Sequence, residues 1–216
     1  MLIFENEKLN IHRLVVGELS TNCYLLTEKK SRQTLIIDPA DAADFIVSEI
    51  SRLGLKPLAE VVTHGHFDHN LAALDLQLAY KIPYLIHEKD EFLLKNLTSS
   101  ANYFLATHEQ YLPPKIDGNI KKNLELGNLT IEVIPTPGHT PGSICLYSKN
   151  NKFLLSGDTL FKDGIGRTDF SYSVEKELVQ SLKTLISLPQ DCLVLPGHGE
   201  ETTLKRERIN LEYTLK

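Results

Sequence analysis

Four short apolar runs of this chain each lead into a side chain that can bind a metal ion, and this arrangement constrains the fold more than any other feature. LAEVV precedes THGHFDH, LTIEVIP precedes His139, NKFLL precedes Asp158, and DCLVLP precedes His198. Runs of about four to eight residues rich in Val, Ile and Leu, bounded by polar or turn residues, are typical of β-strands. Since the ends of neighbouring strands can converge, we expect a β-sheet core with one polar site at its edge.

The segment THGHFDH places several metal-binding side chains within six residues, namely His64, His66, Asp68 and His69. A lone histidine or aspartate after a strand is usually a surface or capping residue, so His139, Asp158 or His198 alone would be weak evidence. Beside the cluster they become candidate partners. One zinc ion takes about four ligands, so the combined set suits two metal ions about 3.5–4 Å apart, with a carboxylate such as Asp158 bridging them.

Both halves of the chain predict strands followed by alternating helix and strand. In the first half, β-rich runs fill residues 1–40, a helix is expected over residues 41–53 with Gly54 as its cap, and a second helical stretch begins near Phe67. In the second half, a helix is expected over residues 173–188 and a final helix extends to Lys216. This pattern indicates an α/β protein in which residues 1–216 form a single domain, with two packed β-sheets and helices on the outer faces.

Residues 96–122 do not follow this pattern. The segment is polar and aromatic and contains the turn signals Pro113-Pro114 and Asp117-Gly118, so we expect a loop or a helical insertion. Its side chains Tyr103, Phe104, Tyr111 and Lys115 either line a substrate pocket or pack among themselves.

Composition excludes several classes of protein. The net charge of −5 argues against a nucleic-acid binder, which needs a broad basic face. The acidic start MLIFENEKLN is unlike a secretory leader, and no apolar run is long enough for a membrane span. Cys23, Cys145 and Cys192 stand singly in apolar runs, which is typical of reduced thiols, so we expect a cytoplasmic protein acting on a small molecule. The sequence leaves the oligomeric state open.

The segments THGHFDH, PTPGHTPGS, SGDTLF, IGRTDF and PGHG, in this order, resemble the metallo-β-lactamase superfamily, and within it the short glyoxalase II-like (hydroxyacylglutathione hydrolase-like) metallo-hydrolases. The resemblance implies an αββα sandwich of two mixed sheets with the site at one edge. It also implies two divalent metal ions, for which zinc is expected and iron or manganese is possible. By position, the ligands of the first metal would be His64, His66 and His139. Those of the second would be Asp68, His69 and His198, with Asp158 between the two metals.

The reaction implied by the resemblance is hydrolysis of a thioester such as S-lactoylglutathione by a hydroxide that the two metals share. Asp68 would orient this nucleophile as well as bind metal. The best-known β-lactamases of the superfamily have a cysteine at the position of Asp158, which speaks against that role. Glyoxalase II proper continues into a helical C-terminal domain that holds glutathione, whereas this chain ends 18 residues after His198. We therefore expect that domain to be absent.

Alternatives remain open at this point. The segment IGRTDF also resembles persulfide dioxygenases, in which the residues matching His64, His139 and Asp158 bind one iron. Hydrolysis of another ester or amide, such as a lactone or a β-lactam, and a non-catalytic metal-binding role are further possibilities. Arg167 and Asp169 either support the site or touch substrate, or they form an ordinary salt bridge that closes a loop.

Asp38 in LIIDPA is expected to support the histidines from behind. His12, His87 and His108 match no ligand position.

Overall fold

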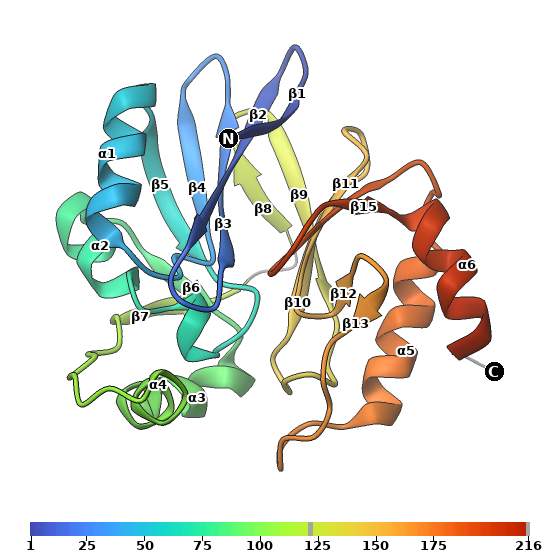
Figure 1. The fold of residues 1–216 in the computed structure, drawn as a ribbon. Coiled ribbons are helices and arrows are strands. Elements are labelled where there is room, and N and C mark those ends of the chain that lie inside the picture. Colours follow the sequence, from blue (N-terminus) through green and yellow to red (C-terminus); the bar gives the residue numbers. More distant parts are fainter. Residues whose placement is uncertain (121–122, 215–216) are drawn as a thin grey trace.

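The computed structural model describes residues 1–120 and 123–214, the last three of these by their backbone alone. Two β-sheets face each other, with a pair of helices on the outer side of each (Figure 1). The architecture is the expected αββα sandwich of two mixed sheets. Within the described part of the chain, no helix combines the length and apolar character needed to cross a membrane.

The first sheet contains both antiparallel and parallel strands. Its order follows the chain: β1 (Leu2–Glu5), β2 (Leu9–Val16), β3 (Thr21–Glu28), β4 (Gln33–Ile37), β5 (Lys56–Val61), β6 (Tyr84–Ile86) and β7 (Ile116–Asn119). Strands β1 to β4 pair antiparallel, and β4 to β7 pair parallel. Parallel neighbours need a crossover, which α1 (Ala43–Leu53) supplies between β4 and β5. Gly54 ends α1 in the left-handed conformation, φ 62°, as predicted.

The second sheet is also mixed. Its order is β15 (Thr202–Thr203), β14 (Leu193–Pro196), β11 (Phe153–Gly157), β10 (Ile144–Ser148), β9 (Leu129–Pro135) and β8 (Asn123–Leu126). Only β11 and β14 pair parallel, and α5 (Glu175–Ile186) connects them. A small ribbon of β12 (Leu160–Phe161) and β13 (Gly164–Ile165) lies in the same crossover.

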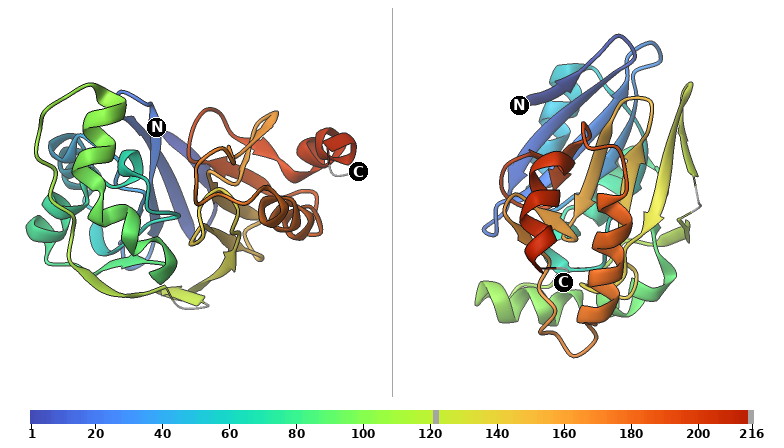
Figure 2. Two further views of the ribbon diagram at one scale, coloured as in Figure 1. Left: turned by 90° about the horizontal axis from the view of Figure 1, so that it is seen from below. Right: turned by 90° about the vertical axis from the view of Figure 1, so that its right-hand side faces the viewer.

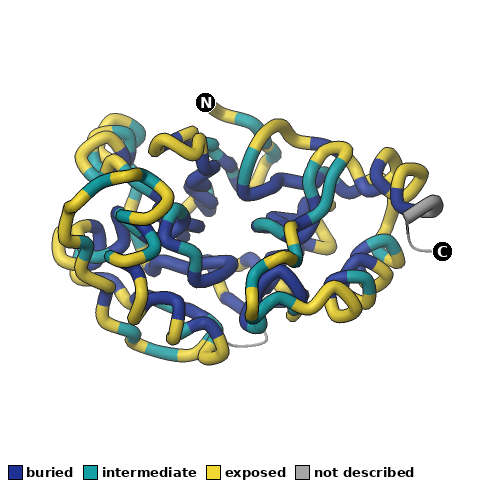
Figure 3. The backbone as a smooth tube through the Cα atoms, turned by 60° about the horizontal axis from the view of Figure 1, so that its bottom comes forward, coloured by how far each residue is buried: buried dark blue, intermediate teal, exposed yellow. Residues whose placement is uncertain are grey.

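Apolar side chains fill three layers of the sandwich. The central layer lies between the sheets and includes Ile11 and Tyr24 from the first sheet, and Leu146 and Phe153 from the second. The outer layers lie under α1 and α2 (Ala73–Tyr80) on one side, and under α5 and α6 (Leu204–Thr214) on the other. The central strands, such as β3, β10 and β11, are accordingly buried, whereas the edge strands β1 and β7 and the outer faces of the helices are partly or fully exposed (Figure 3). The last two residues of the expected final helix lie outside the described residues.

The segment 96–122 contains a helix and a strand. Helix α4 (Leu97–Leu105) follows α3 (Glu91–Lys95), and both lie across one end of the sandwich (Figure 2). Strand β7 then pairs with β6 at the edge of the first sheet, where the Asp117-Gly118 turn signal had favoured a loop. Residues 121–122 of this segment lie outside the described residues.

The two sheets are connected by hydrogen bonds next to the polar site. The side-chain amide of Asn22 and the hydroxyl of Tyr24, both in β3, donate to the carbonyl of Pro196 at 2.9 and 2.7 Å. The backbone of Thr21 forms an isolated β-bridge with His198. These bonds fix the end of β14 against the first sheet.

Candidate metal centre

The predicted ligands converge at the edge of the sandwich where the ends of four strands meet. THGHFDH follows β5 and includes the 3₁₀ helix η1 (Phe67–His69), while His139 lies in the loop between β9 and β10. Asp158 directly follows β11, and His198 follows β14. The structure brings all seven side chains into three overlapping groups, in each of which the ligand atoms lie within 4.8 Å of one another.

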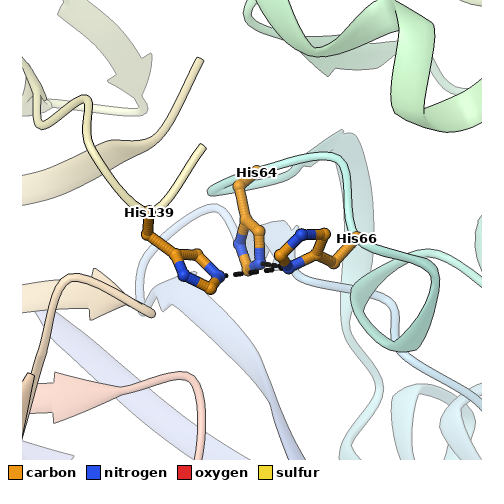
Figure 4. Close-up of side chains that lie close together, drawn as sticks. All are labelled: His64, His66 and His139. Atoms are coloured by element: carbon orange, nitrogen blue, oxygen red, sulfur yellow. Dashed lines mark hydrogen bonds between the residues drawn. The ribbon is translucent and has the colours of Figure 1, made fainter. Parts of the chain in front are cut away.

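The first group consists of His64, His66 and His139. Nδ1 of His66 lies 3.0 Å from Nε2 of His64 and 3.1 Å from Nε2 of His139. Figure 4 shows the three rings pointing toward one another from two separate loops. This is the trio that the resemblance assigns to the first metal.

The second group consists of Asp68, His69 and His198. Nε2 of His198 lies 3.3 Å from Nε2 of His69 and 3.2 Å from Oδ2 of Asp68. Asp158 reaches both groups, because its Oδ1 lies 3.5 Å from His69 Nε2 and its Oδ2 lies 3.7 Å from His139 Nε2. The carboxylate of Asp158 therefore lies between the two groups, a position from which it could bind at both.

Hydrogen bonds to Asp38 fix the tautomers of two histidines. A carboxylate can only accept, so Thr63 Oγ1 donates to Asp38 Oδ2 at 2.7 Å, and His69 Nδ1 donates to the same oxygen at 3.1 Å. With its proton directed at Asp38, Thr63 Oγ1 accepts from His64 Nδ1 at 3.1 Å. The imidazoles of His64 and His69 thus each carry a proton on Nδ1, the outer nitrogen, which faces away from the cluster. Asp38 thus contacts His69 directly and His64 through Thr63.

Backbone carbonyls fix the tautomers of His139 and His198, the two histidines of the cluster that lie in the second half of the chain. His139 Nδ1 donates to the carbonyl of Arg167 at 2.8 Å, and His198 Nδ1 donates to the carbonyl of Leu19 at 3.1 Å. The outer nitrogen of each ring is therefore protonated, and in the neutral form the inner Nε2 presents a lone pair to the cluster. Lone pairs that face one another at these distances require a positive charge between them.

Tyr172 makes a hydrogen bond with His66, the remaining histidine of the cluster. Its hydroxyl lies 2.8 Å from Nε2 of His66, whose other nitrogen faces the cluster. Nothing in the sequence marked Tyr172, because it lies in an unremarkable FSYS stretch after the IGRTDF segment.

Electrostatics also call for a cation. Burial lowers the pKa of His64 and lowers that of His66 to about 3, so these two rings are neutral ligands at neutral pH. Burial acts in the same direction on His69, but the carboxylates of Asp68, Asp158 and Asp38 outweigh it and raise its pKa to about 10. In the absence of metal, a proton on His69 would supply part of the positive charge.

The donor set fits divalent metal ions. Oδ1 of Asp158 is buried and has no hydrogen-bond partner among the described residues, so a ligand-binding lone pair is left unsatisfied. Five imidazoles and two or more carboxylates are ligands that zinc and iron accept in proteins. The arrangement does not by itself select one of these metals.

Comparison with known proteins agrees with this geometry. The family model of the metallo-β-lactamase superfamily matches residues 16–198. The chain belongs to this superfamily.

Curated relatives match this member of the metallo-β-lactamase superfamily over most of their length. Hydroxyacylglutathione hydrolase GloC of Haemophilus influenzae is 34% identical over 203 residues, which cover 93% of this chain and 95% of the relative. The probable metallo-hydrolase YqgX of Bacillus subtilis is 36% identical, with 91% and 93% covered.

Solved structures of the superfamily share the fold and its size. BLEG-1, titled a B3 metallo-β-lactamase, superposes with a TM-score of 0.85 at 32% identity, covering 92% of this chain and 96% of its own. TTHA1623, solved in a di-iron-bound form, gives 0.83 at 32% identity, covering 91% and 96%. ETHE1 from Myxococcus xanthus gives 0.73 at 26% identity, covering 92% and 81%.

A second buried carboxylate, Asp90, fixes two loops of this superfamily site. Asp90 accepts from the backbone N–H of Gly65 at 2.9 Å and from that of Gly142 at 2.6 Å, and Thr140 Oγ1 donates to it at 2.6 Å. It thereby joins the loop that carries His64 and His66 to the loop that carries His139. Sequence reasoning missed Asp90, because a single acid in the stretch HEKDEF looks like a surface residue.

Glycines allow the second half of the superfamily site to pack closely. A Cβ on Gly166 would lie 2.0 Å from the carbonyl oxygen of Asp158, and a Cβ on Gly197 would lie 2.2 Å from Oδ1 of Asp158. Contacts this short are impossible, so only glycine fits at these positions.

A cavity of about 330 Å³ opens beside the ligands. One side is the cluster itself, and the other is mainly apolar, formed by Leu19, Phe67, Leu93, Phe104, Phe170 and Tyr172. Phe104 comes from the segment 96–122, as does Ser100. Of the other side chains singled out there, Tyr111 packs against the layer around Phe67, and Lys115 pairs with Asp117.

Arg167 and Asp169 form the salt bridge that the sequence left as an alternative. Nε and Nη2 of Arg167 donate to the two carboxylate oxygens of Asp169, each at 2.6 Å, and both side chains are exposed. Arg167 also lines the cavity, and its guanidinium lies 4.4 Å from the ring centroid of Phe170. The pair therefore closes a loop at the cavity mouth.

Proposed function

We propose that this protein is a hydrolase that uses two divalent metal ions to cleave an acyl thioester such as S-lactoylglutathione. The observation that carries the proposal is the convergence of the His and Asp side chains, with their lone pairs directed at two neighbouring points. The 34% identity to hydroxyacylglutathione hydrolase GloC supports the thioester as substrate.

The ligands would divide as the distances group them, with His64, His66 and His139 at one metal, Asp68, His69 and His198 at the other, and Asp158 shared. When bound, such a pair lowers the pKa of water from about 15.7 toward about 7 and polarises a carbonyl oxygen. We expect zinc, and iron is the first alternative, because TTHA1623 was solved with two irons.

Asp68 is the residue to which we assign catalysis. It lines the cavity, and its Oδ2 accepts from Thr21 Oγ1 at 3.3 Å. Burial would raise the pKa of Asp68, but His69 and His198 outweigh it and hold the pKa below its usual range. The carboxylate therefore stays an acceptor at neutral pH, and it can orient the attacking water by taking a hydrogen bond from it.

The remaining features of the molecule are consistent with this role. All of the proposed ligands and the cavity lie within residues 1–216, so we propose that this span acts as one domain. The cysteines Cys23, Cys145 and Cys192 are free and buried, which supports a reducing compartment, and we propose the cytoplasm.

Replacing Asp68 tests the proposal. We expect zinc-loaded protein to hydrolyse S-lactoylglutathione, followed as loss of the thioester, and Asp68→Asn to lower kcat/KM at least ~100-fold with little loss of stability. Asp75→Asn, on the exposed face of α2, is the matched control and should keep full activity. Metal content should be measured in both variants, to separate a lost ligand from a lost orientation. Unchanged turnover in Asp68→Asn would exclude the assigned role.

A persulfide dioxygenase is the second candidate, favoured by the likeness to ETHE1 at 26% identity. Iron-loaded protein would then consume oxygen with glutathione persulfide and leave S-lactoylglutathione intact. The likeness to BLEG-1 makes a chromogenic β-lactam a necessary third substrate in the same assay.

A further inference from the structure

Two stacked pairs of rings form a continuous aromatic surface beside the metal ligands. We call Phe67, Phe104, Phe170 and Tyr172 the aromatic wall. Phe67 stacks on Phe104 with ring centroids 5.6 Å apart, and Phe170 stacks on Tyr172 at 5.4 Å. Phe104 and Phe170 meet edge to face at 6.5 Å, which joins the two pairs. All four residues line the cavity.

The aromatic wall lies directly against the reacting centre. The ring of Phe170 is 5.1 Å from that of His66, and the Tyr172 hydroxyl is hydrogen-bonded to the same histidine. Phe104 remains 47% exposed although it lines the cavity, so one face of the wall is free to contact a ligand. A group attached to a carbonyl at the ligand cluster would therefore meet aromatic carbon.

The charged side chains that line the cavity do not favour binding of glutathione, which is a peptide with two carboxylates. Among the described lining residues, Arg167 carries the one guanidinium or ammonium group, and Asp169 already neutralises it through two hydrogen bonds. Asp68 and Asp158 line the same cavity, but their charges would be taken up by the metal ions that they are proposed to bind, so they do not alter the apolar side. Glutathione, with two carboxylates, would find no unpaired cation among these lining residues, so a charged thiol is better placed toward solvent. The aromatic wall is then left for the acyl group.

We propose that the preferred substrates are thioesters with an apolar acyl group, aromatic or branched aliphatic, which packs on the aromatic wall. This inference rests on the proposed thioester hydrolysis and narrows its substrate class. The acyl group determines the affinity, and the thiol contributes little. Burying a phenyl ring on such a surface should favour the larger substrate at least tenfold, since about 0.8 kcal/mol accompanies each buried methylene.

A pair of thioesters of one small neutral thiol, N-acetylcysteamine, tests the proposal. Zinc-loaded protein is assayed with the acetyl and the phenylacetyl thioester by release of the thiol. We expect kcat/KM to be at least about tenfold higher for phenylacetyl, mainly through a lower KM. Phe104→Ser should reduce this ratio to about two or less, and Phe104→Leu, which keeps an apolar contact, should give an intermediate ratio.

Phe45→Ser is the matched control, because Phe45 lies on α1, is 45% exposed, close to the 47% of Phe104, and does not line the cavity. It should keep the wild-type ratio. Circular dichroism checks that each variant is folded. If neither is cleaved but S-lactoylglutathione is, the thiol is recognised and the role of the aromatic wall is overturned. If none of the three thioesters is cleaved, the proposed hydrolase is wrong. If both are cleaved equally, or if Phe104→Ser keeps the wild-type ratio, the hydrolase stands and the role of the aromatic wall is overturned.

Discussion

The two halves of the ligand cluster are built in different ways. The first half supplies its ligands from one continuous segment, residues 64–69, and buried carboxylates hold this segment through hydrogen bonds from Thr63, His69 and Gly65. The second half supplies one ligand from each of three separate loops. These loops are held mainly by backbone carbonyls and glycines, although Asp90 also accepts hydrogen bonds from the loop of His139. The positions of the ligands therefore depend mainly on buried charge in the first half and mainly on close packing in the second. Each half should respond to a different kind of substitution.

Gly166→Ala should have the largest effect, because it breaks the packing of the second half. Its Cβ would lie 2.0 Å from the carbonyl oxygen of Asp158 and 3.2 Å from Cβ of His139, so both ligands must move. A displacement of about 1 Å can cost ~100-fold in rate, and we expect at least that loss in kcat/KM together with loss of bound metal. The measurements are turnover and metal content by atomic absorption.

Gly164→Ala is the control for this prediction. The new Cβ would have only Phe161 within 4 Å, at 3.9 Å. Gly164 begins β13, two residues before Gly166, and its new Cβ meets no ligand, so the control should retain metal and activity. Equal losses in the two variants would show that the loop, and not the contact with Asp158, is responsible.

Asp38→Asn tests the dependence of the first half on charge. Asparagine tolerates the left-handed backbone of this residue, φ 51°, but it cannot accept all three hydrogen bonds from Thr63 and His69 as a carboxylate does. We expect metal affinity to fall about 10–100-fold, as for other residues that orient metal ligands. Competition with a coloured chelator measures this, and Asp44→Asn on the exposed face of α1 should leave the affinity unchanged.

The smallest expected effect on activity is at Glu60, where a substitution should change stability and leave the ligands in place. Glu60 in the first sheet is fully buried and both of its carboxylate oxygens lack a partner among the described residues. Burial, and to a lesser extent Asp117, raise its pKa from 4.5 to about 9. The folded state thus keeps a proton that the unfolded state releases. The free energy of unfolding should fall between these two pKa values as pH rises, by at most about 1.4 kcal/mol per pH unit.

Glu60→Gln removes this titration, so its stability relative to wild type should increase from about pH 5 to about pH 8.5 in urea unfolding. Glu207→Gln is the counterpart in the second half. Glu207 is equally buried but accepts hydrogen bonds from Thr202 at 2.6 Å and Asn210 at 3.2 Å, so its replacement should destabilise. A constant difference between Glu60→Gln and wild type across this pH range would contradict the prediction.

Much of the fold could be predicted because its strands and helices obey simple periodicities. The fully buried strand β3 and the amphipathic helices α1 and α5 stand out in the sequence. The edge strands do not stand out in the sequence. β7 has the sequence IDGN, which reads as a turn, and it is a strand only because β6 offers it a parallel partner. Such tertiary pairing leaves no local signal.

The convergence of the proposed ligands could be predicted for a similar reason, since His64, His66, Asp68 and His69 are close in sequence and the other three follow recognisable strands. That they bind metal stays a prediction. The residues that hold them were harder to find. The sequence indicated Asp38 but not Asp90 or Tyr172, because these two contact residues far away in the chain, and neither spacing nor composition predicts such contacts. Of the aromatic wall, the sequence indicated only Phe104, as one of the residues of segment 96–122 that could line a pocket.

The contact between His69 and His198, at 3.3 Å, joins residues that are 129 positions apart in the chain. This separation has a consequence for biosynthesis. A nascent chain on the ribosome possesses the ligands of residues 64–69 long before His198 emerges, and until then those side chains cannot form the complete pair of sites. Under the proposed dinuclear function, binding of the second metal ion would therefore follow the synthesis and docking of β14, after most of the chain has been made.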